Sequence, residues 1–267
     1  MQRELLESKF ASMGAKVDIQ VGPTGFRRGD YDINVVSGKY IFRVVEERVL
    51  NSFTVLDVDA KDRHLLLMRK ETVLNRRNEP MDFNKFKFLL GHDERDWFVA
   101  GVPDGSTAST VQAAKDILRP DVATRSIKKR GKLKNRNKRR NKGFVRQGEW
   151  FFVPASRDFE DALVLKNEPI VRAGGGKPHI VSEVVRIGGR IVHVRWDHPD
   201  GLSEEEFKKI PKEDRRGFRR MVADAKVYGR GVVRHPDHKT IKLPGWHEVV
   251  PNTENNASQM GSMTFLD

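Results

Sequence analysis

One short stretch of the chain carries nearly all of its excess positive charge. Among residues 125–146, 12 are Lys or Arg and none is acidic, whereas the whole chain has a formal net charge of +13. Lys and Arg neutralise phosphate groups, and Arg also stacks on bases. This basic segment therefore predicts binding to nucleic acid. RNA is favoured over DNA because Arg- and Asn-rich arms that fold on binding are common in RNA-binding proteins.

The residues expected to contact phosphate are all Lys or Arg from the basic segment. They are Lys128, Lys129, Arg130, Lys132, Lys134, Arg136, Lys138, Arg139, Arg140 and Lys142. The segment has no apolar repeat, so we expect a mobile arm without a core of its own. An acidic protein partner is one alternative to nucleic acid. A membrane surface is disfavoured because no apolar helical face accompanies the charges.

Three histidines in the C-terminal part of the chain have the right atoms for metal binding. His235 and His238 form a His-x-x-His pair, and His247 follows. Imidazole nitrogens bind zinc and related metals, and a metal-dependent nuclease could cleave nucleic acid that the basic arm holds. However, Pro236 and Asp237 indicate a turn, and one His pair is a poorly specific motif. The sequence favours ordinary turn residues here and predicts neither a metal nor another cofactor.

A second candidate for catalysis lies between two expected strands. The loop from Gly91 to Trp97 contains His92 and three carboxylates, which are groups that could perform acid–base chemistry. A solvated hairpin turn accounts for the same residues and is the favoured interpretation. His92 is the first choice for a general base and His238 the second. The sequence leaves open whether the protein is an enzyme.

A glycine-rich stretch has some features of a phosphate-binding loop. Residues 173–179 read AGGGKPH. Pro follows the Lys where a P-loop has Ser or Thr, and a strand rather than a helix is expected next. The stretch is therefore interpreted as a flexible linker in which Lys177 adds a phosphate contact. None of these motifs indicates a particular protein family.

The apolar pattern predicts short strands and a few helices. Helices are expected over residues 2–13, 107–118, 204–209 and 212–221. Ser203 and Glu206 form a capping-box signature at the start of the third. Strands over 180–187 and 190–196 flank Gly188-Gly189, which suits a tight hairpin turn. In the strand that follows the arm, alternation predicts that two of the three aromatic residues Trp150, Phe151 and Phe152 lie in the core and one on the surface.

These elements predict an α+β protein of mainly antiparallel β-sheets with a few short helices. The expected division is an N-terminal α+β sheet region (1–124), a basic arm (125–146), a β-rich region (147–251) and a polar tail (252–267). The chain has no cysteine, which excludes disulfides and cysteine-bound zinc. It shows no apolar run of the ~20 residues that span a bilayer and no secretory signal. We expect a cytoplasmic protein that acts as a component of a ribonucleoprotein.

Overall fold

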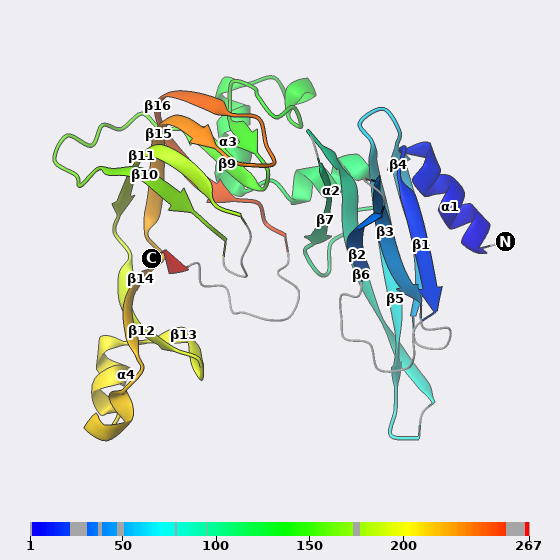
Figure 1. The fold of residues 1–267 in the computed structure, drawn as a ribbon, viewed down its shortest axis with the longest axis horizontal. Coiled ribbons are helices and arrows are strands. Elements are labelled where there is room, and N and C mark those ends of the chain that lie inside the picture. Colours follow the sequence, from blue (N-terminus) through cyan, green and yellow to red (C-terminus); the bar gives the residue numbers. More distant parts are fainter. Residues whose placement is uncertain are drawn as a thin grey trace. The chain divides into compact units, whose positions relative to one another are not determined.

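The computed structural model describes residues 2–21, 31–36, 39–46, 51–77, 79–94, 96–172, 177–254 and 265–266 (Figure 1). They form short helices and mainly antiparallel strands, which confirms the predicted α+β class. Two compact units result: unit 1 draws on Met1–Arg119 and Thr253–Ser258, and unit 2 on Pro120–Asn252 and Gln259–Asp267. No helix in these ranges is long and apolar enough to cross a membrane.

Unit 1 combines two helices with two sheets. Its elements are α1 (Gln2–Ser12), β1 (Lys16–Val21), β2 (Tyr31–Val36), β3 (Lys39–Glu46), β4 (Asn51–Asp59), β5 (His64–Leu74), β6 (Pro80–Asp93), β7 (Asp96–Val102) and α2 (Val111–Ile117). One sheet has the order β1-β3-β2, in which β1 and β3 are parallel, and the other is the antiparallel meander β4-β5-β6-β7. Gly14, with φ +78°, follows α1 and ends it where the sequence predicted.

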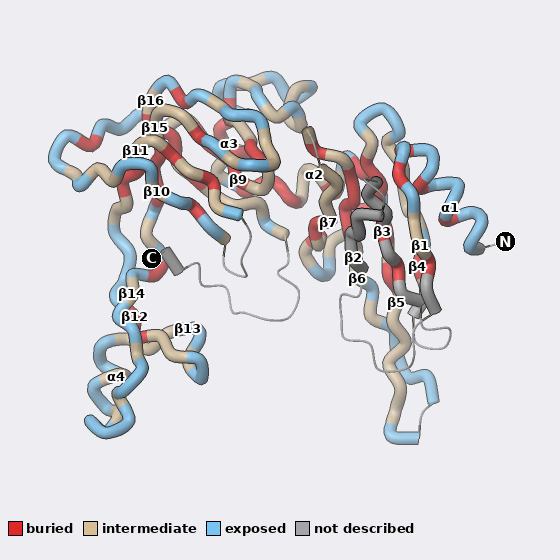
Figure 2. The backbone as a smooth tube through the Cα atoms, viewed as in Figure 1, coloured by how far each residue is buried: buried red, intermediate tan, exposed pale blue. Residues whose placement is uncertain are grey.

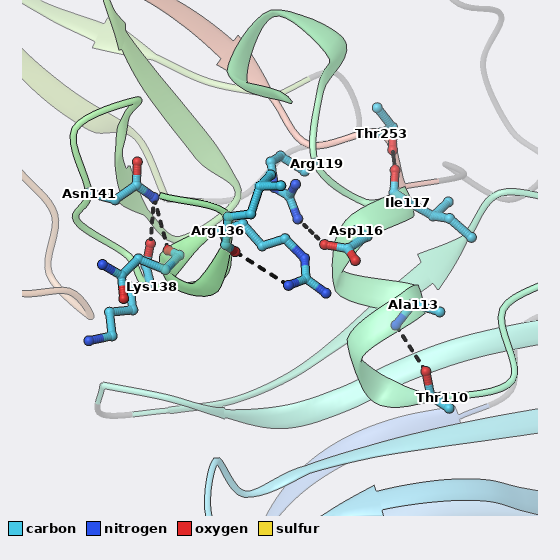
Figure 3. Close-up of polar contacts among 11 residues, drawn as sticks. Thr110, Ala113, Asp116, Ile117, Arg119, Arg136, Lys138, Asn141 and Thr253 are labelled. Atoms are coloured by element: carbon cyan, nitrogen blue, oxygen red, sulfur yellow. Dashed lines mark hydrogen bonds and ion pairs between the residues drawn. The ribbon is translucent and has the colours of Figure 1, made fainter. Parts of the chain in front are cut away.

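The meander of unit 1 is covered on both faces because successive strand residues alternate sides. Leu65 and Leu67 pack into a core that includes Phe10 of α1. Leu66, between them, packs into a second core that includes Val111 of α2. Helix α2 begins later than the predicted residue 107 because Thr110 caps it: the Thr110 hydroxyl accepts the N–H of Ala113 at 3.1 Å (Figure 3).

Unit 2 is built on a six-stranded antiparallel sheet with the order β10-β11-β15-β16-β9-β8. Its elements are α3 (Asp121–Arg130), the 3-10 turn η1 (Leu133–Asn135), β8 (Val145–Gln147), β9 (Trp150–Pro154), β10 (Leu165–Ile170), β11 (His179–Ile187), β12 (Arg190–Arg195), β13 (His198–Ser203), α4 (Glu204–Lys209), the 3-10 turn η2 (Lys212–Arg215), β14 (Arg219–Ala223), β15 (Lys226–Arg234), β16 (Ile241–Pro251) and β17 (Phe265–Leu266). A smaller sheet has the order β13-β12-β14-β17.

A long two-stranded ribbon joins the two sheets of unit 2. Strand β11 pairs with β15 up to Ile187 and Lys226, and β12 pairs with β14 from Arg190 and Ala223. The predicted hairpin at Gly188-Gly189 is therefore wrong, because the strands that flank it pair with other strands. The helix predicted over 212–221 is also wrong, since η2 and β14 occupy most of that range. The capping box before α4 is confirmed, and α4 itself is largely exposed (Figure 2).

The basic segment belongs to unit 2 and is not an arm that joins two regions. The boundary between the units falls after Arg119, and helix α3 begins the second unit. Ala123 and Ile127 lie one helical turn apart on α3 and pack with Phe144 and with Phe151 of β9. These few apolar residues suffice because the large sheet supplies the rest of the core. The two units thus divide after residue 119, whereas the sequence predicted divisions on either side of 125–146.

Asn141 shapes the turn that returns the basic segment to the sheet. Its side-chain oxygen accepts the N–H groups of Gly143 at 2.7 Å and Phe144 at 3.1 Å. Its side-chain nitrogen donates to the carbonyls of Lys138 at 3.2 Å and Asn135 at 3.4 Å (Figure 3). These bonds satisfy backbone groups of the turn, as Asn often does in loops.

Helix α3 also explains why all three aromatic residues of β9 are buried. Trp150 and Phe152 face one core of unit 2, and Phe151 faces the core beneath α3. The sequence predicted that one of the three would reach the surface, but α3 covers that face of β9. These rings are therefore not available to stack on bases.

The contact between α3 and Gly143 gives a test of the folded basic segment. A Cβ added at Gly143 would lie 2.8 Å from the Cα and N atoms of Ile127. We expect Gly143→Ala to lower the free energy of unfolding by about 1–3 kcal/mol, because overpacking forces the helix to move. Gly245→Ala is the matched control, since its Cβ would meet no atom within 4 Å. Equal urea-unfolding midpoints for the two variants would contradict the packing.

Candidate functional site

The basic segment carries many exposed cations that lie close together in the chain, and we call them the basic surface. Its members are Arg125, Lys128, Lys129, Arg130, Lys132, Lys134, Lys138, Arg140 and Lys142. Among the described residues, none of these cations takes part in an ion pair. Two further predicted contacts, Arg136 and Arg139, are half-buried, as is Arg146. Since no acidic residue interrupts the segment, its positive charge is concentrated on this part of unit 2.

Local bonds hold some of these cations in place. The guanidinium of Arg130 donates to the Ser156 hydroxyl at 3.0 Å, and that of Arg136 donates to the Leu133 carbonyl at 3.3 Å (Figure 3). Burial lowers the pKa of Arg139 to about 10, and the charge of Arg146 adds to this effect. Burial also lowers the pKa of Arg146 to about 10. Arg139 and Arg146 therefore remain protonated at neutral pH.

A second candidate site is a cluster of three histidines at one end of the large sheet. His179 begins β11, and His235 and His238 lie in the turn between β15 and β16. One nitrogen of each ring lies within 4.8 Å of a nitrogen of the other two, and we call these residues the histidine cluster. The pairing of Ile180 with Arg234 brings their neighbours His179 and His235 together. Their ring centroids are 4.2 Å apart.

The turn between β8 and β9 borders the histidine cluster. Glu149 Oε2 lies 3.6 Å from His179 Nε2. Gly148 has φ +56°, a conformation that favours glycine, and a Cβ there would lie 2.7 Å from His238 Nε2. The backbone at Gly148 therefore fits closely against the cluster, and a larger residue would displace it.

Gln147 orients the cluster from within the sheet. Its amide nitrogen donates to the carbonyls of Lys239 at 2.8 Å and Val233 at 3.4 Å. Its amide oxygen is left to accept, and it lies 2.9 Å from Nδ1 of His179. His179 therefore carries a proton on Nδ1, and its Nε2 faces Glu149.

The electrostatics of the β15–β16 turn favour uncharged imidazoles at His235 and His238. Burial, followed by the charges of His235 and His179, lowers the pKa of His238 to about 4. The pKa of His235 is also lowered by burial and by His179. Burial alone would raise the pKa of Glu149, but its interactions with His179 and its own N–H outweigh burial and lower it. The positive charge of Arg139 acts on His238 in the same direction as burial.

None of the remaining sequence candidates is a member of the histidine cluster. His247 is buried on β16 and directs Nδ1 to the Gly245 carbonyl at 2.7 Å. His92 belongs to unit 1, where its ring packs edge-on against Trp97 with 5.0 Å between centroids. Lys177 forms an ion pair with Asp237. Residues 173–176 of the glycine-rich stretch lie outside the described residues.

Sequence reasoning missed four residues of the site. They are Gln147, Gly148, Glu149 and His179. His179 is far from the His-x-x-His pair in the sequence, and only the pairing of β11 with β15 joins them. The sequence did contain one signal for these four residues: they lie at the ends of expected strands, where side chains from different strands can meet.

Comparisons of the chain with models of protein families, with curated proteins and with solved structures found no match.

The hydrogen bonds of Gln147 predict a large effect on stability. Gln147→Leu would leave the Lys239 and Val233 carbonyls and the His179 N–H without this partner inside the sheet. Each such buried group costs about 1–3 kcal/mol, so we expect a clear fall in the urea-unfolding midpoint. Gln112→Leu, on the exposed side of α2, should leave the midpoint nearly unchanged. A wild-type midpoint for Gln147→Leu would refute the network.

Proposed function

We propose that the protein binds nucleic acid, RNA in preference to DNA, through the basic surface. The observation that carries the proposal is a group of exposed cations, close together in the chain, that form no ion pairs with described residues. Such charges repel one another, and a polyanion relieves that repulsion while releasing its own counterions. We further propose a cytoplasmic ribonucleoprotein as the setting of this binding.

The fold of the basic segment adds to this argument. Helix α3 packs on β9, and Asn141 closes the following turn, so the main chain that carries the cations is ordered before binding. Less conformational entropy is then lost when phosphate binds. A mobile arm would lose more.

The position of the cations on α3 supports RNA over duplex DNA. Helix-turn-helix proteins read bases with the N-terminal residues of a recognition helix. In α3 the cations Lys128, Lys129 and Arg130 occupy the last turn, and the N-terminal turn carries Asp121. This arrangement suits contacts to a phosphate backbone better than insertion into a DNA major groove.

Neutralising the basic surface should reduce both affinity and its dependence on salt. The test variant replaces four exposed lysines by Gln: Lys128, Lys129, Lys134 and Lys138. If each contacts one phosphate, the slope of log K against log salt should become less steep by about 3. The control variant changes four exposed lysines elsewhere in unit 2: Lys209, Lys212, Lys226 and Lys242.

Fluorescence anisotropy with labelled RNA and DNA of equal length measures these slopes. A test variant with the same slope as the control would reject the basic surface as the binding site. Equal or tighter binding of an acidic peptide would assign the surface to a protein partner instead. Tighter binding of DNA than of RNA would overturn the stated preference.

A second candidate function is a metal-dependent nuclease, in which the basic surface holds the substrate. The favouring observation is that the charge of Arg139, in the basic segment, acts on His238 in the histidine cluster. Arg146 itself lies in β8, and that strand leads directly into the turn that contains Glu149. The cations and the histidines thus belong to one continuous part of unit 2.

Cleavage assays distinguish this second candidate from simple binding. A nuclease should cut labelled RNA or DNA in the presence of Mg²⁺, Mn²⁺ or Zn²⁺ and not after chelation. We expect His238→Ala to lower such cleavage about 100-fold or more, while nucleic-acid affinity stays within a few-fold. His92→Ala should leave both unchanged because His92 is not a member of the histidine cluster. Absence of cleavage with every metal would eliminate the nuclease.

A further inference from the structure

The arrangement of side chains around His179 suits a bound cation. Gln147 can only accept from His179 Nδ1, because its amide nitrogen already donates to two carbonyls. The contact with Gln147 therefore directs the other ring nitrogen, Nε2, towards the turn that contains Glu149. Nε2 lies 3.6 Å from Glu149 Oε2. An imidazole nitrogen and a carboxylate oxygen at this spacing can bind one cation between them.

We propose that His179, His235 and His238 bind one divalent metal ion of the zinc class and that Glu149 completes its coordination. The three imidazoles each offer one nitrogen to the same small volume. The carboxylate adds a negative charge on the side where His179 Nε2 points. This inference concerns metal binding alone, and it holds whether or not the protein binds or cleaves nucleic acid.

The distances suit a tetrahedral ion after a small closure. Bonds of about 2.1 Å to zinc place neighbouring ligand atoms about 3.4 Å apart. The 3.6 Å between Glu149 Oε2 and His179 Nε2 is close to this spacing. The histidine nitrogens span up to 4.8 Å and must approach one another. His235 would exchange one of its two bonds, to the Lys177 carbonyl or from the Asp237 N–H, for the metal.

The chemistry of the donor set selects the metal. Imidazole nitrogens with a single carboxylate suit Zn²⁺, Co²⁺ and related ions, whereas Ca²⁺ and Mg²⁺ prefer sites made of oxygen atoms. Gln147 plays the part that a neighbouring acceptor commonly plays beside a metal-bound histidine: it fixes the tautomer and the direction of the ring. The stacking of His235 on both other rings shows that the turn already holds the three imidazoles together.

The metal alone is the probe for this proposal. The full-length protein is stripped with a chelator, dialysed and titrated with Zn²⁺ by calorimetry, and bound metal is measured by mass spectrometry. Co²⁺ serves as a second probe, since a tetrahedral site gives an intense visible absorption. We expect one ion per chain and a tetrahedral Co²⁺ spectrum. A stoichiometry near zero, or six-coordinate Co²⁺ only, would overturn the proposal.

Paired variants then test the named ligands. The double variant His235→Ala/His238→Ala should bind Zn²⁺ at least about 100-fold more weakly. The control His198→Ala/His247→Ala also loses two histidines of unit 2, yet should keep wild-type affinity because neither belongs to the cluster. Circular dichroism confirms that both variants are folded. Equal weakening in the two would show that the bound metal is not held by the cluster.

Glycine variants provide a test that removes no ligand. Gly148 and Gly188 both have positive φ, but only a Cβ at Gly148 would meet the cluster, whereas one at Gly188 would meet no atom within 4 Å. Gly148→Ala should therefore weaken Zn²⁺ binding about tenfold or more, and Gly188→Ala should not. Similar affinities for these two variants would show that the metal does not sit against the β8–β9 turn.

Discussion

The positions of both candidate sites depend on three hydrogen bonds of one buried side chain, that of Gln147. Gln147 fastens the end of β8 to the carbonyls of Val233 and Lys239 on either side of the β15–β16 turn, and to the ring of His179 at the start of β11. The basic segment runs into β8, and Gly148 and Glu149 form the turn that follows this strand. A buried polar group is stable only when its partners are in place, so this residue permits one arrangement of three strands.

Local signals in the sequence correctly predicted those helix ends that depend only on neighbouring residues. Ser203 and Glu206 cap α4 because both partners of that interaction lie within one helical turn. Gly14 ends α1 for the same kind of reason. Gly188 and Gly189 carry an equally clear turn signal, but β11 and β12 each find a partner from β14–β15 and continue as a ribbon. A glycine pair marks a change of backbone direction and does not specify which strands pair.

The candidate sites show the same division between local and distant information. The cations and the His235–His238 pair are visible in the sequence because each is a short run of residues. His179 and Glu149 join that pair only through the antiparallel sheet. Their positions at the ends of expected strands do not specify which strands pair. Likewise, the apolar content of the basic segment is too low to predict a core. Ile127 and Phe144 acquire one because β9 presents Phe151 and Val153 to them.

The order of strands in the large sheet has a consequence for synthesis of the chain. Strand β9 lies between β8, its immediate neighbour in sequence, and β16, which pairs Pro251 with Trp150. Contacts between residues so far apart in sequence form slowly and only after the later strand exists. On a ribosome the basic segment therefore emerges about a hundred residues before the strand that completes the sheet behind it. Its cations are exposed to the nucleic acid of the ribosome, and to any other polyanion nearby, before unit 2 has closed.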